Sequence, residues 1–361
     1  MSGAADPRVA VRGAAGARRL HTARPSAPWL VGAVLLLLAA CLVGVAVGPV
    51  DIGAGAIVRA ALAHVPFLDV RSPLSPSEEA IVFELRLPRV VLGALVGAML
   101  ASSGAAFQGA FRNPLADPYL LGAAAGAGLG ATLVVAYAPD PLTGRLLPVA
   151  AFTGAAGAVV CAYAIGRSAG GRSAVSLLLA GVVVASFLTA VQIFVQQQNV
   201  DTVQEVYSWL LGRLATAGWH DVLIVLPYAV VSAGVLLVHR RLLDVLAVGD
   251  EEASALGVDV RRVRLIVIAG ATLGTAAAVA VSGLIGFVGI IVPHTIRLLA
   301  GGSYRVLLPL SLLCGAAFLV LADVLARTIL APAELPIGVV TAFFGAPFFA
   351  VVLSRSRLVA S

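Results

Sequence analysis

The chain has 361 residues, of which 60% are hydrophobic and 12% are charged, and its mean hydropathy is +1.02. A soluble domain of average composition carries about 25% charged residues and about 45–50% apolar residues. This composition excludes a cytosolic enzyme, a nucleic-acid-binding module and a secreted disulfide-bonded domain, because too few polar side chains are available to cover a globule. It predicts an all-α, polytopic integral membrane protein.

The charge of the chain is carried unevenly. The net charge is +6, and all 24 basic residues are arginines. In a soluble protein a basic balance would suggest nucleic acid as a partner. In a membrane protein it reflects the excess of basic residues in cytoplasmic segments. We therefore expect contact with membrane lipid and no nucleic-acid partner.

Residues 1–28 are rich in Ala, Gly, Pro and Arg and show no hydrophobic period. They are predicted to form a disordered cytoplasmic arm. The alternative is an export signal, which Arg18-Arg19 would suit. The apolar run from Trp29 to Gly48 that follows lacks a convincing cleavage site, so we favour an uncleaved first membrane helix.

Nine further apolar runs can each form a membrane helix, since a crossing needs about 20 apolar residues. Two of these runs meet at Ser282-Gly283, where a sharp turn between two helices is predicted; one long, kinked helix is the alternative. The runs cover 90–111, 119–138, 146–165, 174–195, 221–238, 264–283, 284–300, 306–325 and 336–353.

The arginines test this topology. With the N-terminus inside, the inner segments hold 17 arginines and the outer segments hold 7. The bias supports about ten transmembrane helices with both termini cytoplasmic. The predicted permease domain covers residues 29–355 and is followed by a cytoplasmic tail, 356–361. Its main connections are two outer segments, 49–85 (with a short interfacial helix) and 196–218, and the inner loop 239–263.

Motifs for chemistry are absent from the sequence. It has no phosphate-binding loop, no HExxH and no Cys/His pair at metal-ligand spacing, so we expect no catalytic residue, no metal site and no cofactor. The predicted membrane core also lacks the buried acids that mark proton-coupled carriers. Asp323 and Arg327 are explained as a pair four residues apart at a helix end. Energy for uphill transport would then come from another subunit.

The inner loop contains a candidate docking element. Asp250, Glu251 and Glu252 are acids at the start of an amphipathic stretch, where they suit the helix dipole. Ala253 and Leu256 follow, and Gly257 is the expected C-cap. A short cytoplasmic helix of this kind would suit a soluble partner, and an ordinary linker between two membrane helices is an equally good interpretation.

Three ordered segments carry a family resemblance over about residues 80–355. They resemble the permease subunits of type II ABC importers, the iron-siderophore, haem and cobalamin uptake family (FecCD/BtuC-like). The first segment is Leu85-Arg86-Leu87-Pro88-Arg89 with Asn113-Pro114-Leu115-Ala116-Asp117-Pro118 and Leu121-Gly122. The second is Ser282 to Gly289 with Val292-Pro293-His294 and Arg297-Leu298. The third is Ala322-Asp323 and Ala326-Arg327 with Ala331 to Gly338, Thr341 and Gly345-Ala346-Pro347.

The resemblance implies a non-catalytic permease subunit in the bacterial cytoplasmic (plasma) membrane. Its partners would be two ATP-binding-cassette ATPase subunits, an extracytoplasmic substrate-binding protein and a second permease, which is either an identical copy or a related chain. The cargo would be an iron-siderophore complex, with haem or cobalamin as alternatives. A secondary transporter or channel that works without ATPases is the alternative function.

The resemblance also assigns roles to residues. Glu252, Ala253, Leu256 and Gly257 match the coupling helix that contacts the ATPase, and Asp250 and Glu251 belong to the same segment. Arg86, Arg89 and Arg327 match outer arginines that pair with carboxylates of the binding protein, a role that suits the guanidinium fork. The alternative is that these arginines only anchor helix ends at the lipid headgroups.

Two gates are implied as well. Asn113 and Leu115, with Pro114 between them, match an inner constriction after the second membrane helix. The second gate falls at Ala174 and Val175, where relatives can carry paired hydroxyl groups, so this sequence predicts a more apolar closure. Ser102, Ser103, Gln108 and Asn113 would offer weak hydrogen bonds along the passage.

Overall fold

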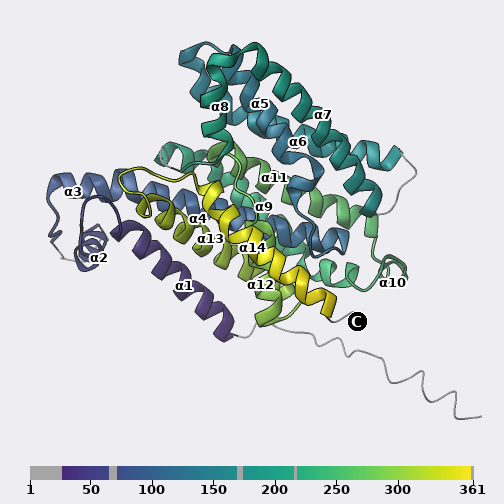
Figure 1. Ribbon diagram of the computed structural model, residues 1–361. Coiled ribbons are helices and arrows are strands. Elements are labelled where there is room, and N and C mark those ends of the chain that lie inside the picture. The colour runs from purple at the N-terminus through teal and green to yellow at the C-terminus, as the bar shows by residue number, and fades with distance from the viewer. Residues whose placement is uncertain (1–26, 65–70, 169–173, 215–217, 359–361) are drawn as a thin grey trace, which may run out of the picture.

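The computed structural model describes residues 27–64, 71–168, 174–214 and 218–358, and every regular element in these ranges is helical (Figure 1). Within them, seven apolar stretches are long enough to cross a membrane by length and composition. They fall on α1 (Ala27–Ala46), α4 (Leu87–Phe111), α6 (Asp140–Ser168), α7 (Ala174–Gln198), α9 (Trp219–Leu246), α11 (Val260–Ser282) and α13 (Tyr304–Thr328). The prediction of an all-helical, polytopic membrane protein is confirmed.

The remaining helices are shorter or less regular. The apolar ones are α2 (Ala54–Ala63), α5 (Ala123–Tyr137), α12 (Val288–Ala300) and α14 (Ile337–Leu358). The others are α3 (Pro76–Ala80), the π-helix η1 (Ile81–Arg86), the 3₁₀ turns η2 (Pro118–Leu121) and η3 (Val200–Thr202), α8 (Val203–Leu210) and α10 (Asp250–Ala255). The ten predicted runs correspond to the seven long helices with α5, α12 and α14. The number of crossings and the side on which the termini lie stay predictions.

Helix α4 is the centre of the bundle. It packs against α9, α11, α12 and α13, and most of its side chains are buried. Two glycines set how closely its neighbours approach: a Cβ at Gly97 would overlap the backbone of Gly315 in α13, and one at Gly104 would overlap the backbone of Gly289 in α12. Small residues allow such close backbone packing where lipid supplies no hydrophobic drive for helix association.

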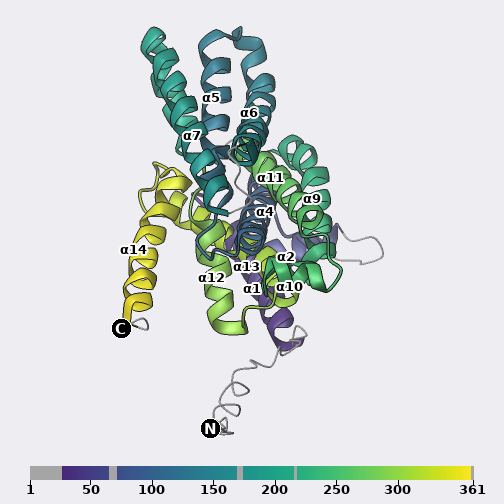
Figure 2. The same ribbon diagram turned by 90° about the vertical axis from the view of Figure 1, so that its right-hand side faces the viewer.

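The outer surfaces of the bundle are strongly apolar. Helices α5, α6 and α7 stand side by side at its upper end in Figure 2, and α14 lies at its edge, where it packs on α12 and α13. Phe343 on α14 is 79% exposed and Phe187 on α7 is 68% exposed. Exposed apolar faces of this size require lipid or a second membrane subunit to cover them.

The predicted break at Ser282-Gly283 is confirmed. Gly283 has φ 69° and Phe287 has φ 67°, so the backbone leaves the helical conformation twice within five residues. Helix α12 therefore begins at Val288 and not at residue 284. The carbonyl of Ser282 accepts a hydrogen bond from the backbone N–H of Arg213 (2.8 Å), which ties the break to the loop after α8.

Several predicted boundaries need correction. Helix α9 continues to Leu246, past the predicted end at 238, because its charged last turns serve the fold: Asp244 accepts hydrogen bonds from Ser303 Oγ (2.9 Å) and the Tyr304 N–H (2.6 Å) and so caps α13. The segment 196–218, predicted as a loop, contains α8. The segment 49–85 contains the expected short helix as α2, and α3 in addition.

The predicted terminal segments are covered only in small part. Of the arm 1–28, residues 1–26 lie outside the described residues, and the last two begin α1. Of the tail 356–361, residues 359–361 also lie outside them, and α14 extends to Leu358.

Candidate functional site

Helix α10 has the boundaries that its sequence predicts. It begins at Asp250 and ends before Gly257, which has φ 81°. The N–H of Val258 donates to the Ala253 carbonyl (3.1 Å) and the N–H of Gly257 donates to the Ser254 carbonyl (2.9 Å). These two bonds form a Schellman cap, which needs a left-handed residue at the position of Gly257. The predicted C-cap is therefore confirmed.

The two faces of α10 differ. Ala253 is fully buried, whereas Glu251 and Glu252 are exposed and Leu256 is 71% exposed. One apolar and two acidic side chains are thus available to a partner on a short helix held by its cap. This exposed set is named the α10 surface below.

A single arginine connects α10 to the central helix. Arg264, in the first turns of α11, donates from Nη2 to both carboxylate oxygens of Asp250 (2.8 and 3.0 Å). Its Nε donates to the carbonyl of Ala110, in the last turn of α4 (2.8 Å). Arg112 Nε lies 3.9 Å from Asp250 Oδ1. Helix α10 is therefore joined to the end of α4 through charged hydrogen bonds.

The predicted first gate follows that end of α4 directly. Arg112 adopts a left-handed conformation with φ 50° and ends the helix. Asn113 Oδ1 accepts from the Leu115 N–H (3.0 Å), and the Asn113 carbonyl accepts from the Ala116 N–H (3.0 Å). The segment of Asn113, Pro114 and Leu115 is thus a tight turn close to the inner cluster of Asp250 and Arg264.

The second predicted gate falls on Ala174 and Val175. These residues begin α7, and their side chains lie outside the described residues. The gating roles of both segments stay predictions.

Two irregular segments that are distant in sequence meet inside the bundle. Asp117 Oδ1 accepts from the Tyr119 N–H (2.8 Å) and caps η2. The Tyr119 hydroxyl donates to the Ile285 carbonyl (3.2 Å) and accepts from the Ile285 N–H (3.3 Å). Non-helical backbone at membrane depth needs such internal partners. Sequence analysis placed both segments in family motifs and missed this contact, because nothing local pairs a tyrosine with a backbone group 166 residues away.

The prediction that Ser102, Ser103 and Gln108 line a passage is wrong for this conformation. All three side chains are buried inside the subunit. Ser102 Oγ donates to the Ala98 carbonyl (2.7 Å) in its own helix, and Gln108 Nε2 donates to the Gly289 carbonyl (3.1 Å) in α12. The polar groups of Ser102 and Gln108 thus bond within the helix bundle, which an apolar run with scattered polar residues cannot reveal.

The outer arginines form a second charged cluster, at the start of α4. Arg89 bridges two acids: it donates from Nε and Nη2 to Asp323 (2.9 and 2.8 Å) and from Nη1 and Nη2 to Glu334 (2.8 and 3.0 Å). The guanidinium fork suits this double bidentate contact. Arg89 is 13% exposed at its side chain, whereas Glu334 is 39% exposed.

The other two outer arginines are buried. Arg86 donates from Nη1 to the carbonyls of Val45 (2.9 Å) and Ala46 (3.0 Å) at the end of α1. Arg327 donates from Nη2 to the carbonyl of Gly44, and its Nε lies 3.6 Å from Asp323 Oδ2, which confirms the predicted pair. Both guanidinium groups thus satisfy carbonyls at or near a helix end.

Glu334 titrates in a perturbed environment. Its hydrogen bonds to Arg89 hold the pKa of this carboxyl below its usual range, against a smaller opposing effect of burial. The ionised form is therefore favoured while the Arg89 contact lasts. Elsewhere in the described ranges, no group of three His, Cys, Asp or Glu side chains is arranged to hold a metal ion.

The chain is similar to a known protein family, to individual relatives in sequence and to a solved structure. The family model of the FecCD transport family matches residues 34–355. The cobalamin import system permease protein BtuC of Halobacterium salinarum is 41% identical over 355 residues, which cover 90% of this chain and 95% of that protein. The hemin transport system permease protein HmuU of Yersinia pestis is 40% identical and covers 77% of this chain and 84% of its own.

A solved structure supports the fold. A protein described as a metal-chelate type ABC transporter in an inward-facing conformation superposes with a TM-score of 0.78 at 30% identity, over 90% of this chain and 98% of its own. The chain belongs to the FecCD transport family. It is a multi-pass membrane permease of the ABC-transporter class.

Proposed function

We propose that this chain is the translocation subunit of an ATP-driven importer of metal chelates in the cytoplasmic membrane. Ten helices cross the membrane, with both termini and α10 on the cytoplasmic side. The chain performs no covalent chemistry, and a separate ATPase supplies the energy. The observation that carries the proposal is the α10 surface together with the Arg264 connection. An importer that is driven by a separate ATPase subunit needs a surface that binds the ATPase and a set of contacts that connects this surface to the membrane helices.

The α10 surface is the docking element for the ATPase. Glu251, Glu252 and Leu256 project from a helix whose other side is held by Ala253 and Asp250. An exposed apolar side chain beside two acids suits a partner with an apolar pocket and basic residues. The resemblance to the coupling helices of the family supports the same assignment.

Movement of α10 then acts on the first gate. Asp250 pulls on Arg264, and Arg264 holds the carbonyl of Ala110 one turn before Asn113. When the ATPases close on ATP, the turn of Asn113, Pro114 and Leu115 shifts with α10, and the start of α7 at Ala174 and Val175 closes from the other side. Alternating access of this kind requires two discrete arrangements of packed helices.

The passage forms between two permease subunits, either identical copies or this chain with a related one. The apolar faces of α14 and α7, with Phe343 and Phe187, are candidates for covering by the second subunit or by lipid. A two-fold pair has the usual symmetry of a membrane oligomer with a central path.

The binding protein docks at the opposite end, near Arg86, Arg89 and Arg327. In the closed cluster Arg89 is bound to Glu334, the exposed member of the pair. Docking through Arg89 therefore requires a carboxylate of the binding protein to replace Glu334 on this arginine. This exchange leaves the number of ion pairs unchanged, so its free-energy cost is small.

The cargo is a metal chelate. Sequence analysis places an iron-siderophore complex first, whereas the names of the relatives point to cobalamin and hemin as well. Specificity lies with the binding protein, since the described core offers few polar groups to a ligand. Uptake of a ferric siderophore, hemin and cyanocobalamin into the same cells, with this chain deleted and restored, identifies the cargo.

The decisive experiment reverses the α10 surface. The variant E251R/E252R, expressed together with a candidate partner ATPase, is expected to lose co-purification of the ATPase and ATP-dependent uptake by proteoliposomes. The matched control is R240Q/R241Q, at the end of α9, which changes two charges on a neighbouring helix and should keep the association. If uptake persists without ATP or ATPase in the wild type, the chain is a secondary transporter or channel and the proposal fails.

A further inference from the structure

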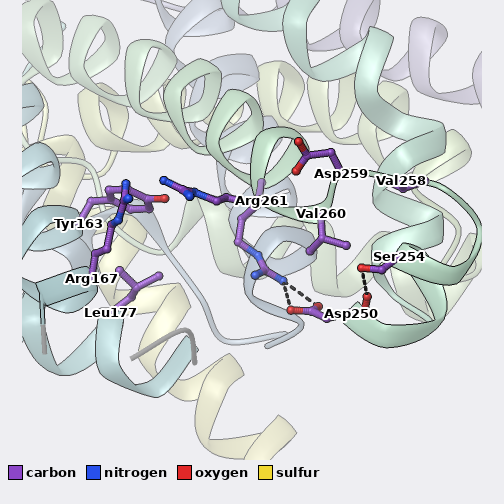
Figure 3. Close-up of a pocket in the computed structure, with 10 residues that line it drawn as sticks. Tyr163, Arg167, Leu177, Asp250, Ser254, Val258, Asp259, Val260 and Arg261 are labelled. Atoms are coloured by element: carbon purple, nitrogen blue, oxygen red, sulfur yellow. Dashed lines mark hydrogen bonds and ion pairs between the residues drawn. The ribbon is translucent and has the colours of Figure 1, made fainter. Parts of the chain in front are cut away.

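A pocket of about 650 Å³ opens between the ends of α6, α7, α10 and α11 (Figure 3). It lies behind α10, on the side of Asp250 and Ser254, and not at the α10 surface. Its walls bring together side chains from four helices, and three of them are arginines: Arg167, Arg261 and Arg264. The proposed function gives this pocket no task.

The acids in the pocket already have partners. Asp250 is bound to Arg264 through two hydrogen bonds. Asp259 Oδ1 accepts from the Arg262 N–H (3.0 Å) and caps the start of α11. Asp250 is therefore paired with an arginine, and one oxygen of Asp259 is used by the helix cap.

Two arginines remain on the other side of the pocket. Neither Arg167 nor Arg261 has a salt-bridge partner among the residues that the structure describes. Tyr163 and Arg167 of α6 and Arg261 of α11 line this pocket together, so one hydroxyl and two guanidinium groups from two helices border the same space (Figure 3). Arg167 and Arg261 are both exposed, so their positive charges are available to an anionic ligand that enters the pocket.

The chemistry of this group selects a phosphate. The planar guanidinium fork donates two parallel hydrogen bonds to phosphate oxygens, and a tyrosine hydroxyl adds a third donor. Two arginines from different helices give a geometry that a single surface arginine lacks.

The surroundings of the pocket add acyl chains to the phosphate. On α6, Tyr163 lies three residues after Val160 and Arg167 lies seven residues after it, so the three side chains share one face of the helix. On α11, Leu265 lies four residues after Arg261 on the same face. Val160 is 67% exposed and Leu265 is 42% exposed. Each arginine thus stands at the end of an apolar stripe on a helix of the membrane region.

We propose that this pocket binds the headgroup phosphate of an anionic phospholipid, with the acyl chains along Val160 and Leu265. Basic pockets between helix ends are suited to such lipids because both the charge and the apolar surface contribute. An acidic segment of the ATPase is the less favoured occupant, since the chain presents its exposed docking groups, Glu251, Glu252 and Leu256, away from the pocket and they are themselves acidic.

The test uses the full chain, purified in detergent and stripped of lipid, and measures lipid binding by native mass spectrometry. Dioleoyl-phosphatidylglycerol is titrated, with dioleoyl-phosphatidylcholine as the neutral reference. We expect preferential binding of phosphatidylglycerol, and an affinity about tenfold lower in R167Q/R261Q, from the loss of two basic contacts. The variant R167K/R261K keeps the charge and should keep most of the affinity.

The matched control is R240Q/R241Q at the end of α9, which removes the same charge elsewhere. Unchanged melting temperatures exclude a folding defect. The proposal is overturned if the control lowers affinity as much as R167Q/R261Q, because the attraction is then general. It is also overturned if inorganic phosphate at equal concentration displaces the lipid, or if R167Q/R261Q loses the ATPase and keeps the lipid.

Discussion

The two charged clusters at the ends of α4 contain the same residue types but use them for different purposes. In the outer cluster, Arg86, Arg89 and Arg327 turn inward and bond to carbonyls and acids of the same subunit. In the inner cluster, Arg264 and Asp250 are bonded, while Glu251 and Glu252 stay exposed on α10. A charge that the fold satisfies holds helices together, and a charge that the fold leaves in solvent is available to a partner.

This difference changes how the outer arginines should be tested. The docking role predicts that R86E/R327E weakens the docking of the binding protein while the subunit still folds. Both guanidinium groups are buried on carbonyls, so glutamates there would place unpaired acids beside acceptors. We expect that double variant to fail in folding, and milder changes at Arg89 and Glu334 are the informative ones.

Among single substitutions, the largest expected effect is at Arg89. Replacement by alanine leaves Asp323 buried without its bidentate partner, and breaking a buried pair on one side costs about 3–5 kcal/mol. The melting temperature of the purified subunit should drop strongly. The control is Arg145→Ala, an exposed arginine at the start of α6, which should melt like the wild type. Equal melting of both variants would remove the distinction between the two clusters.

Arg264 should have an intermediate effect. Its loss removes charge-assisted hydrogen bonds to Asp250 and to the Ala110 carbonyl, with a total stability cost of about 1.5–3 kcal/mol, because the Asp250 side chain is 41% exposed and water replaces part of the contact. Arg264→Ala should also separate ATP hydrolysis from uptake, since α10 is no longer tied to α4. Arg262→Ala, two residues away and exposed, is the control. An Arg264→Ala transporter that retains full coupling would contradict the proposed connection.

Glu334 should matter less and should depend on pH. As a partly exposed pair, it contributes about 0.2–1 kcal/mol. Its pKa is lowered in the folded state, so this contribution is present at neutral pH and is lost as pH falls through the folded-state pKa. The difference in melting temperature between wild type and Glu334→Gln should therefore shrink from pH 7 to pH 3. A constant difference would show that the ion pair is not its source.

The smallest effect on stability is expected at Leu256. This side chain is 71% exposed, so Leu256→Ser should change the free energy of unfolding by no more than about 0.5 kcal/mol. The association of the Leu256→Ser permease with the ATPase should nevertheless weaken, because the exposed apolar group is lost. The measurement is binding of the ATPase by surface-immobilised permease, with Ser254→Ala as the control on the opposite face. Unaltered binding would remove Leu256 from the α10 surface.

Much of the fold could be read from local patterns. Ten apolar runs correspond to ten helices, the break at Ser282-Gly283 is where the glycine predicted it, and α10 starts at its acids and stops at Gly257. Helix α8 was missed because its eight residues are too few to show a membrane period. The predicted end of α9 at residue 238 is too early. Charged residues follow it and favour a loop in the sequence, whereas Asp244 uses its charge to cap α13.

The sequence by itself determined which segments form the long helices and where α10 begins and ends, because apolar runs, caps and glycines act within a few residues. Only the tertiary structure decided which charges are satisfied. Arg89 and Asp323 are 234 residues apart, and Tyr119 and Ile285 are 166 apart, so no local pattern can pair them. Helix packing decides which arginines face inward, which acids of α10 remain exposed and which pocket Arg167 and Arg261 line together. Packing in turn follows from close backbone contact over the whole bundle.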